Sequence, residues 1–114
     1  MRLLVFEFIS GGGLANEALP DHLAQEGLMM RTALLDDLSA VENLELIVLN
    51  DVRISEPEVQ GSILTIEPGI NLLSYLTTIH DSYEAVWLIA PESSGILVDW
   101  QQFFMQQNKL LCLS

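Results

Sequence analysis

The feature that most constrains this fold is the alternation of short apolar runs with stretches of helical periodicity. Helices are predicted to open at Pro20 and to cover residues 70–80 and 96–107. Such an order is typical of a single α/β domain, 1–114, with a mostly parallel sheet of four to five strands and helices on both faces. The runs that read as strands span residues 2–8, 44–49, 61–66, 85–90 and 109–113.

Two of the runs carry more specific expectations. Gly61–Ile66 is the weakest and is expected at an edge of the sheet, whereas Leu110–Ser114 reads as a core strand at which the chain stops. In the first helix, Gly27 costs roughly 1 kcal/mol relative to alanine, so we expect it to pack closely against a strand. The predicted buried face of that helix consists of Leu23, Met30, Leu34, Leu38 and Val41.

The charge balance limits the classes of partner. Sixteen Asp and Glu residues face four Lys and Arg residues, for a net charge of −12. Such a field repels nucleic acid and anionic membrane surfaces and favours a cationic or amine-bearing ligand or a divalent metal, although it also serves solubility alone. Cys112 is the only cysteine, which excludes an internal disulfide and indicates a cytoplasmic protein. No apolar run approaches the ~20 residues of a membrane span.

Unusual residues follow three of the predicted strands. Glu7 and the Ser10–Gly13 turn follow the first, Asp51 and Arg53 the second, and Pro91–Gly95 the fourth. Because ligands of open α/β sheets bind at the carboxyl ends of the strands, these residues are the candidates for a ligand-facing edge.

The run of three glycines is the most unusual of these features. Glycine adds no side chain to a core, so the run indicates a turn or a close approach to a ligand. Leu14-Ala15 after the last glycine excludes a P-loop, and the spacing does not match the dinucleotide motif. A backbone cradle for a carboxylate or phosphate and a flexible connection both remain open.

The common catalytic and metal-binding patterns are missing. Ser93 and Ser94 do not lie in a nucleophile elbow, and neither His22 nor His80 has a metal-ligand partner four residues on. Asp36-Asp37 reads as a solvated pair. The sequence therefore predicts no catalytic residue and no metal ligand.

Three segments together resemble the N-terminal region of ATP-grasp ligases. They are Glu7–Gly13, Glu26–Met30 and Trp87–Glu92, the last followed by Gly95-Ile96-Leu97. The most similar group is that of tyramine–glutamate ligase, which acts in methanofuran biosynthesis and one-carbon metabolism. The resemblance implies a Rossmann-like, three-layer pre-ATP-grasp domain. In such enzymes, which join a carboxylate to an amine, the ATP-grasp domains that follow hold ATP and Mg²⁺.

On this resemblance, the chain helps to form the substrate pocket and is inactive alone, binding no ATP or metal. Glu7 or Glu92 would pair with an amine substrate, and the glycine amides would receive an anionic oxygen. The motifs do not clearly reach Asp51 and Arg53. The implied substrate-binding residues are Glu7, Ser10, Gly11, Gly12, Gly13, Pro91, Glu92 and Gly95.

The resemblance also implies partners. They are the ATP-grasp domains, expected after residue 114, and a small-molecule amine or carboxylate. The alternative is a stand-alone α/β binding or dimerisation module, and a homodimer is conceivable through any surface left uncovered. A flavodoxin-like redox protein is disfavoured because a Ser/Thr-rich phosphate loop is absent.

Overall fold

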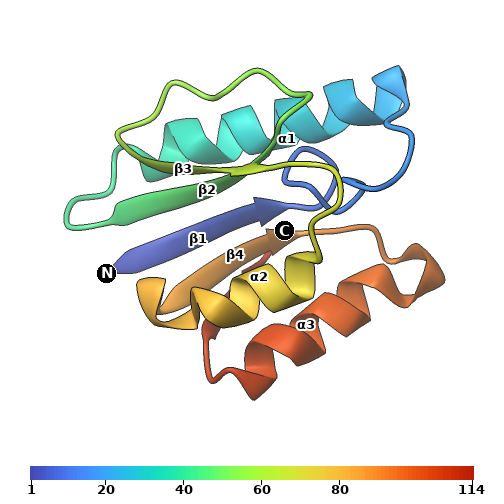
Figure 1. Ribbon diagram of the computed structural model, residues 1–114. Coiled ribbons are helices and arrows are strands. Elements are labelled where there is room, and N and C mark those ends of the chain that lie inside the picture. Colours follow the sequence, from blue (N-terminus) through green and yellow to red (C-terminus); the bar gives the residue numbers. More distant parts are fainter.

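The computed structural model describes residues 1–114 and has an α/β architecture (Figure 1). The strands are β1 (Arg2–Glu7), β2 (Glu45–Asp51), β3 (Gly61–Ile66), β4 (Ala85–Ile89) and β5 (Leu110–Leu113). The helices are α1 (Asp21–Leu38), α2 (Leu72–Thr78) and α3 (Ile96–Gln106), with short 3₁₀ turns η1 (His80–Ser82) and η2 (Ser93–Gly95). The predicted alternation is therefore confirmed, with boundaries shifted by one or two residues.

All five strands are parallel, in the order β3-β2-β1-β4-β5. α1 covers one face of the sheet, and α2 and α3 cover the other, which gives three layers (Figure 1). β1 and β4 lie side by side at the centre, although α1, β2, β3 and α2 separate them in the chain. In such sheets the direction of winding reverses at this point, and a crevice opens between the loops that follow the two strands.

Alternation along β1 sends side chains into two apolar layers. Leu4 and Phe6 join the layer under α2 and α3, and Leu3 and Val5 join the layer under α1. Phe6 packs edge-to-face on Trp100 of α3, with ring centroids 4.9 Å apart. Glu7 continues the odd-numbered series, so its side chain faces α1.

The predicted buried face of α1 is partly wrong. Leu38 is buried, but Met30 is 47% exposed and Val41 lies beyond the end of the helix. The face that meets the sheet consists of Gly27, Arg31, Leu35 and Leu38. An apolar pattern cannot find this face because its second member is an arginine, of which only Nη1 has hydrogen-bond partners beneath the helix.

The expectation that β5 is a core strand is also wrong. β5 is an edge strand with only β4 beside it, and Leu110 is 65% exposed. Trp87 of β4 is half-buried for the same reason, and its indole Nε1 donates to Ser114 Oγ at 2.6 Å. The edge position of β3 is confirmed, and His22 and His80 are exposed. None of the helices combines the length and the apolarity needed to cross a membrane.

Candidate functional site

The glycine turn is built around the carboxylate of Glu7. This side chain is 1% exposed and accepts hydrogen bonds from the amides of Ile9 at 3.0 Å and Ser10 at 2.7 Å. A buried carboxylate is tolerated only when it is paired or hydrogen-bonded, and these two amides supply the bonds. The anion that the turn holds is therefore a side chain of the protein itself.

Packing requires glycine at all three positions of the turn. Gly12 has φ +97°, and a Cβ there would lie 2.5 Å from Cγ2 of the buried Ile66. The amide of Gly11 donates to Glu7 O and that of Gly13 to Phe8 O, both at 2.8 Å. Two of the amides that the resemblance assigned to a ligand are thus occupied within the turn.

Arg31 is the main residue of the site that sequence reasoning missed. It is fully buried, and its Nη1 donates to Asn50 Oδ1 at 2.9 Å and more weakly to Leu49 O and Ser10 O. Burial lowers the pKa of the Arg31 guanidinium, and the nearby charge of Glu7 opposes that shift. The sequence contains one signal that Arg31 is buried. It lies one helical turn after Gly27, so both residues share a helix face.

Gly27 makes room for Glu7. A Cβ at Gly27 would lie 2.9 Å from Glu7 Cδ and 3.1 Å from Ile9 Cβ, and it would also overlap Glu7 Oε1. The expected close packing of Gly27 on a strand is confirmed, and its reason is the carboxylate at the end of β1. Glu7, Gly27 and Arg31 are hereafter called the Glu7 cluster.

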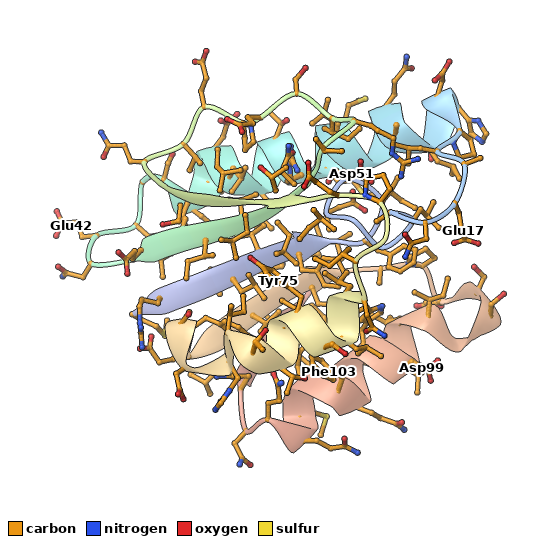
Figure 2. All side chains as sticks on the ribbon, viewed as in Figure 1. Glu17, Glu42, Asp51, Tyr75, Asp99 and Phe103 are labelled. Carbon is orange, nitrogen blue, oxygen red and sulfur yellow. The ribbon has the colours of Figure 1, made fainter.

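Asp51 and Arg53 form a structural pair at the carboxyl end of β2, where Figure 2 labels Asp51. Arg53 Nη2 lies 2.8 Å from Asp51 Oδ2, and its Nη1 and Nη2 also donate to Glu17 O and Leu14 O, both at 2.7 Å. The pair thus ties the segment after the glycine turn to β2. Burial raises the pKa of the Asp51 carboxyl, but hydrogen bonds and charge from Arg53 outweigh this and leave the pKa below its ordinary value.

We expect Asp51→Asn to lower the free energy of unfolding at neutral pH by about 1–3 kcal/mol, as loss of a charged hydrogen bond does. A carboxyl whose pKa is depressed in the folded state stabilises the protein above its unfolded pKa and loses that effect as pH falls. Urea unfolding at about pH 7 and about pH 3 should therefore show a smaller acid-dependent loss for Asp51→Asn than for the wild type. Asp37→Asn, an exposed position on α1, is the control. Equal acid-dependent losses in the wild type and Asp51→Asn would contradict the pairing.

A cavity of about 540 Å³ opens on the α1 side of the sheet at the carboxyl ends of β1 and β4. Its walls are mainly apolar, and its two acidic residues are Glu7 and Glu26. Of the predicted substrate-binding residues, Glu7 and Pro91 line it. The apolar part of the lining is made by Phe8, Ile9, Leu14, Leu23, Met30, Ile89, Ala90 and Ile96.

The remaining predicted residues lie elsewhere. Gly12 and Gly13 line a separate hollow of about 340 Å³, whose other walls come from residues 15–17, from α2 with the two residues before it, and from Trp100 of α3. Because these helices cover the opposite face of the sheet, the glycine turn and the Pro91 loop do not form one shared cleft. Ser10 and Gly11 are buried, whereas Glu92 and Gly95 are exposed outside both hollows.

The cationic side chains are engaged within the chain itself. Triphosphate binding needs free cations or free amides. No three His, Cys, Asp or Glu side chains lie close enough together to hold a metal ion. Each of the four cationic side chains already contacts an oxygen atom of the chain, and these are Arg2, Arg31, Arg53 and Lys109.

The order of the sheet and the cavity at its strand ends define a Rossmann-like domain. Comparison with known families is more specific, because residues 44–113 match the family described as the pre ATP-grasp 3 domain. The match spans more than half of the chain, so the protein belongs to this family, which supports its assignment as the N-terminal domain of an ATP-grasp ligase. Searches of curated proteins and of solved structures gave no match. The glycine turn and Arg31 lie outside the matched residues.

Proposed function

We propose that the chain is the N-terminal domain of an ATP-dependent carboxylate–amine ligase and forms one wall of its amine pocket. The observation that carries the proposal is the apolar cavity at the strand ends of a pre-ATP-grasp domain. Two carboxylates line this cavity, and no cationic side chain does. The ATP-grasp domains would hold ATP and Mg²⁺, so the chain is not catalytic alone. The single cysteine favours a cytoplasmic location.

The two carboxylates of the cavity have different tasks in this proposal. Both oxygens of Glu7 accept amide hydrogen bonds, and the charge of Arg31 lies nearby, so Glu7 contributes little net charge. Glu26 is exposed at the mouth and is free to pair with an ammonium group. Glu92, between the lining residues Pro91 and Ser93, stays a candidate for guiding the amine in.

The apolar walls suit an amine with an aromatic or aliphatic body. For this reason we also propose the narrower assignment to the tyramine–glutamate ligase group. Burial of an aromatic ring among such side chains would supply most of the binding energy, and the ion pair would orient the amine.

An NMR titration of the isotope-labelled chain with tyramine tests this proposal. We expect amide signals of Ile9, Gly27 and Ala90 to shift, and Glu26→Gln to weaken binding about two- to fivefold, because an exposed ion pair contributes up to about 1 kcal/mol. Glu42→Gln makes the same charge change at the opposite end of the molecule and should bind normally (Figure 2). The neutral analogue 4-ethylphenol should bind more weakly. Equal binding of both compounds, or no effect of Glu26→Gln, would refute the role of the carboxylate.

A stand-alone binding or dimerisation module is the second candidate. The exposed apolar side chains of β5 favour it, since an edge strand that has Leu110 and Leu113 on its surface can pair with another chain. Dimerisation makes no demand on the cavity, so the tyramine titration tests the amine pocket independently of it.

A further inference from the structure

The outer edge of β5 has free main-chain groups. Within the sheet, the amide of Leu110 donates to Glu84 O at 3.2 Å and that of Ser114 to Leu88 O at 3.3 Å. Successive residues of a strand point their amide and carbonyl groups to opposite sides. The groups of Leu111 and Leu113 therefore point away from β4, toward the open edge.

The segment that ends in β5 is also free of acidic residues in an otherwise acidic molecule, and Lys109 is its one charged side chain. No Asp or Glu follows Asp99 in the sequence, although the chain has sixteen acidic residues. The other edge strand, β3, is flanked by Glu58 and Glu67, and charged residues of this kind discourage pairing. A basic partner would be drawn to the acidic faces. A partner with the same charge of −12 can approach without strong repulsion only through a neutral surface.

We propose that β5 pairs with β5 of a second copy of this chain, antiparallel about a two-fold axis, and joins the two sheets into one. Exposed apolar side chains on the strand agree with this role, since Leu110 is 65% and Leu113 46% exposed. The inference does not rest on the ligase assignment.

The free groups select one register. If the two-fold axis passes beside Cys112, Leu111 of each copy faces Leu113 of the other, and the two pairs form four main-chain hydrogen bonds. If the axis passes beside Leu111 or Leu113 instead, some of the outward main-chain groups of these two residues have no partner. The selected register places the two Cys112 side chains directly opposite each other, with Cβ atoms about 4.5–5.5 Å apart. Cys112 is a free, exposed thiol, so a disulfide between the two copies would report this geometry.

Analytical ultracentrifugation and mild oxidation with copper phenanthroline test the interface on the 114-residue chain. We expect a dimer at micromolar concentration that oxidation converts to a Cys112-linked dimer, two thiols losing two protons and two electrons to the oxidant. Leu113→Lys should weaken the dimer at least tenfold. Leu113→Pro should do the same while keeping the fold, because it removes an amide that makes no bond to β4 and edge strands tolerate proline.

Val52→Lys is the matched control, since Val52 is 45% exposed and the charge change is identical. It should leave both the dimer and the crosslink intact. Circular dichroism confirms folding, and if Leu113→Lys does not fold, Leu113→Pro decides the result. A wild-type chain that stays monomeric at several hundred micromolar would overturn the proposal. So would a dimer that survives in the folded Leu113 variants or dissociates equally in Val52→Lys.

Discussion

Replacing Arg31 with methionine is expected to lower the free energy of unfolding by about 3–5 kcal/mol, because it leaves the buried charge of Glu7 without the opposite charge that lies near it. The guanidinium is fully buried and joins α1 to the ends of β1 and β2 through Ser10 O, Leu49 O and Asn50 Oδ1. Methionine keeps much of the volume but leaves Asn50 Oδ1 without its donor and the charge of Glu7 without its neighbour. Urea unfolding followed by tryptophan fluorescence measures the change.

Arg2→Met is the control for this prediction. Arg2 pairs with a carboxylate, that of Glu84 at 2.8 Å, and both side chains are nearly half exposed. Exposed pairs contribute at most about 1 kcal/mol, so this variant should unfold almost like the wild type. In addition, the combined cost of Glu7→Gln and Arg31→Met should be smaller than the sum of the two, because each removes the charge that the other compensates. Equal effects of Arg31→Met and Arg2→Met, or strictly additive costs, would show that the buried charges are not coupled.

Gly27→Ala is expected to destabilise the protein by about 1–3 kcal/mol, as overpacking of a core does. Helix propensity alone predicts the opposite sign, a gain of about 1 kcal/mol. The steric effect dominates because the added methyl group would lie 2.9 Å from Glu7 Cδ. The end of a glutamate side chain can usually move aside, but moving this one breaks its bonds to the amides of Ile9 and Ser10.

Ala33→Gly measures helix propensity at an exposed position of the same helix. It should cost about 1 kcal/mol, so that alanine is preferred at residue 33 and glycine at residue 27. Thermal unfolding by circular dichroism compares the two variants. A Gly27→Ala variant more stable than the wild type would mean that Glu7 moves freely and that the Glu7 cluster does not hold the end of β1.

The Gly27→Ala and Arg31→Met variants also bear on the cavity. Glu7 and Gly27 both line it, and the amides that bind the Glu7 carboxylate belong to the turn that follows β1. The Glu7 cluster therefore positions one side of the cavity and contributes little charge to it. In the proposed amine pocket, Gly27→Ala is expected to disturb binding of the amine because it displaces this wall.

Much of the fold could be predicted because strands and helices have different periods. The runs around β1 and β4 are uniformly apolar since both faces of the central strands are covered, and uniform burial is characteristic of parallel sheets. β5 has the same composition but lies at the edge. The composition of a segment indicates whether it can be buried, but the elements beside it decide whether it is. Arg31 of α1 shows the same limit, because its neighbours bury a residue that composition places on the surface.

By itself, the sequence determined the α/β class, the order of its elements and the placement of Glu7 and Pro91 at one edge of the sheet. These follow from local periodicity and from the rule that parallel strands end on the same side. Only the tertiary structure decided that the glycine turn encloses Glu7 and that its last two glycines face the opposite side of the sheet from the cavity. Arg31 reaches Ser10, twenty-one residues away in the chain, and Asn50, nineteen away, so no local pattern encodes these contacts. Packing of α1 on the sheet brings these groups together, and the cost of leaving charges unpaired in the core keeps them there.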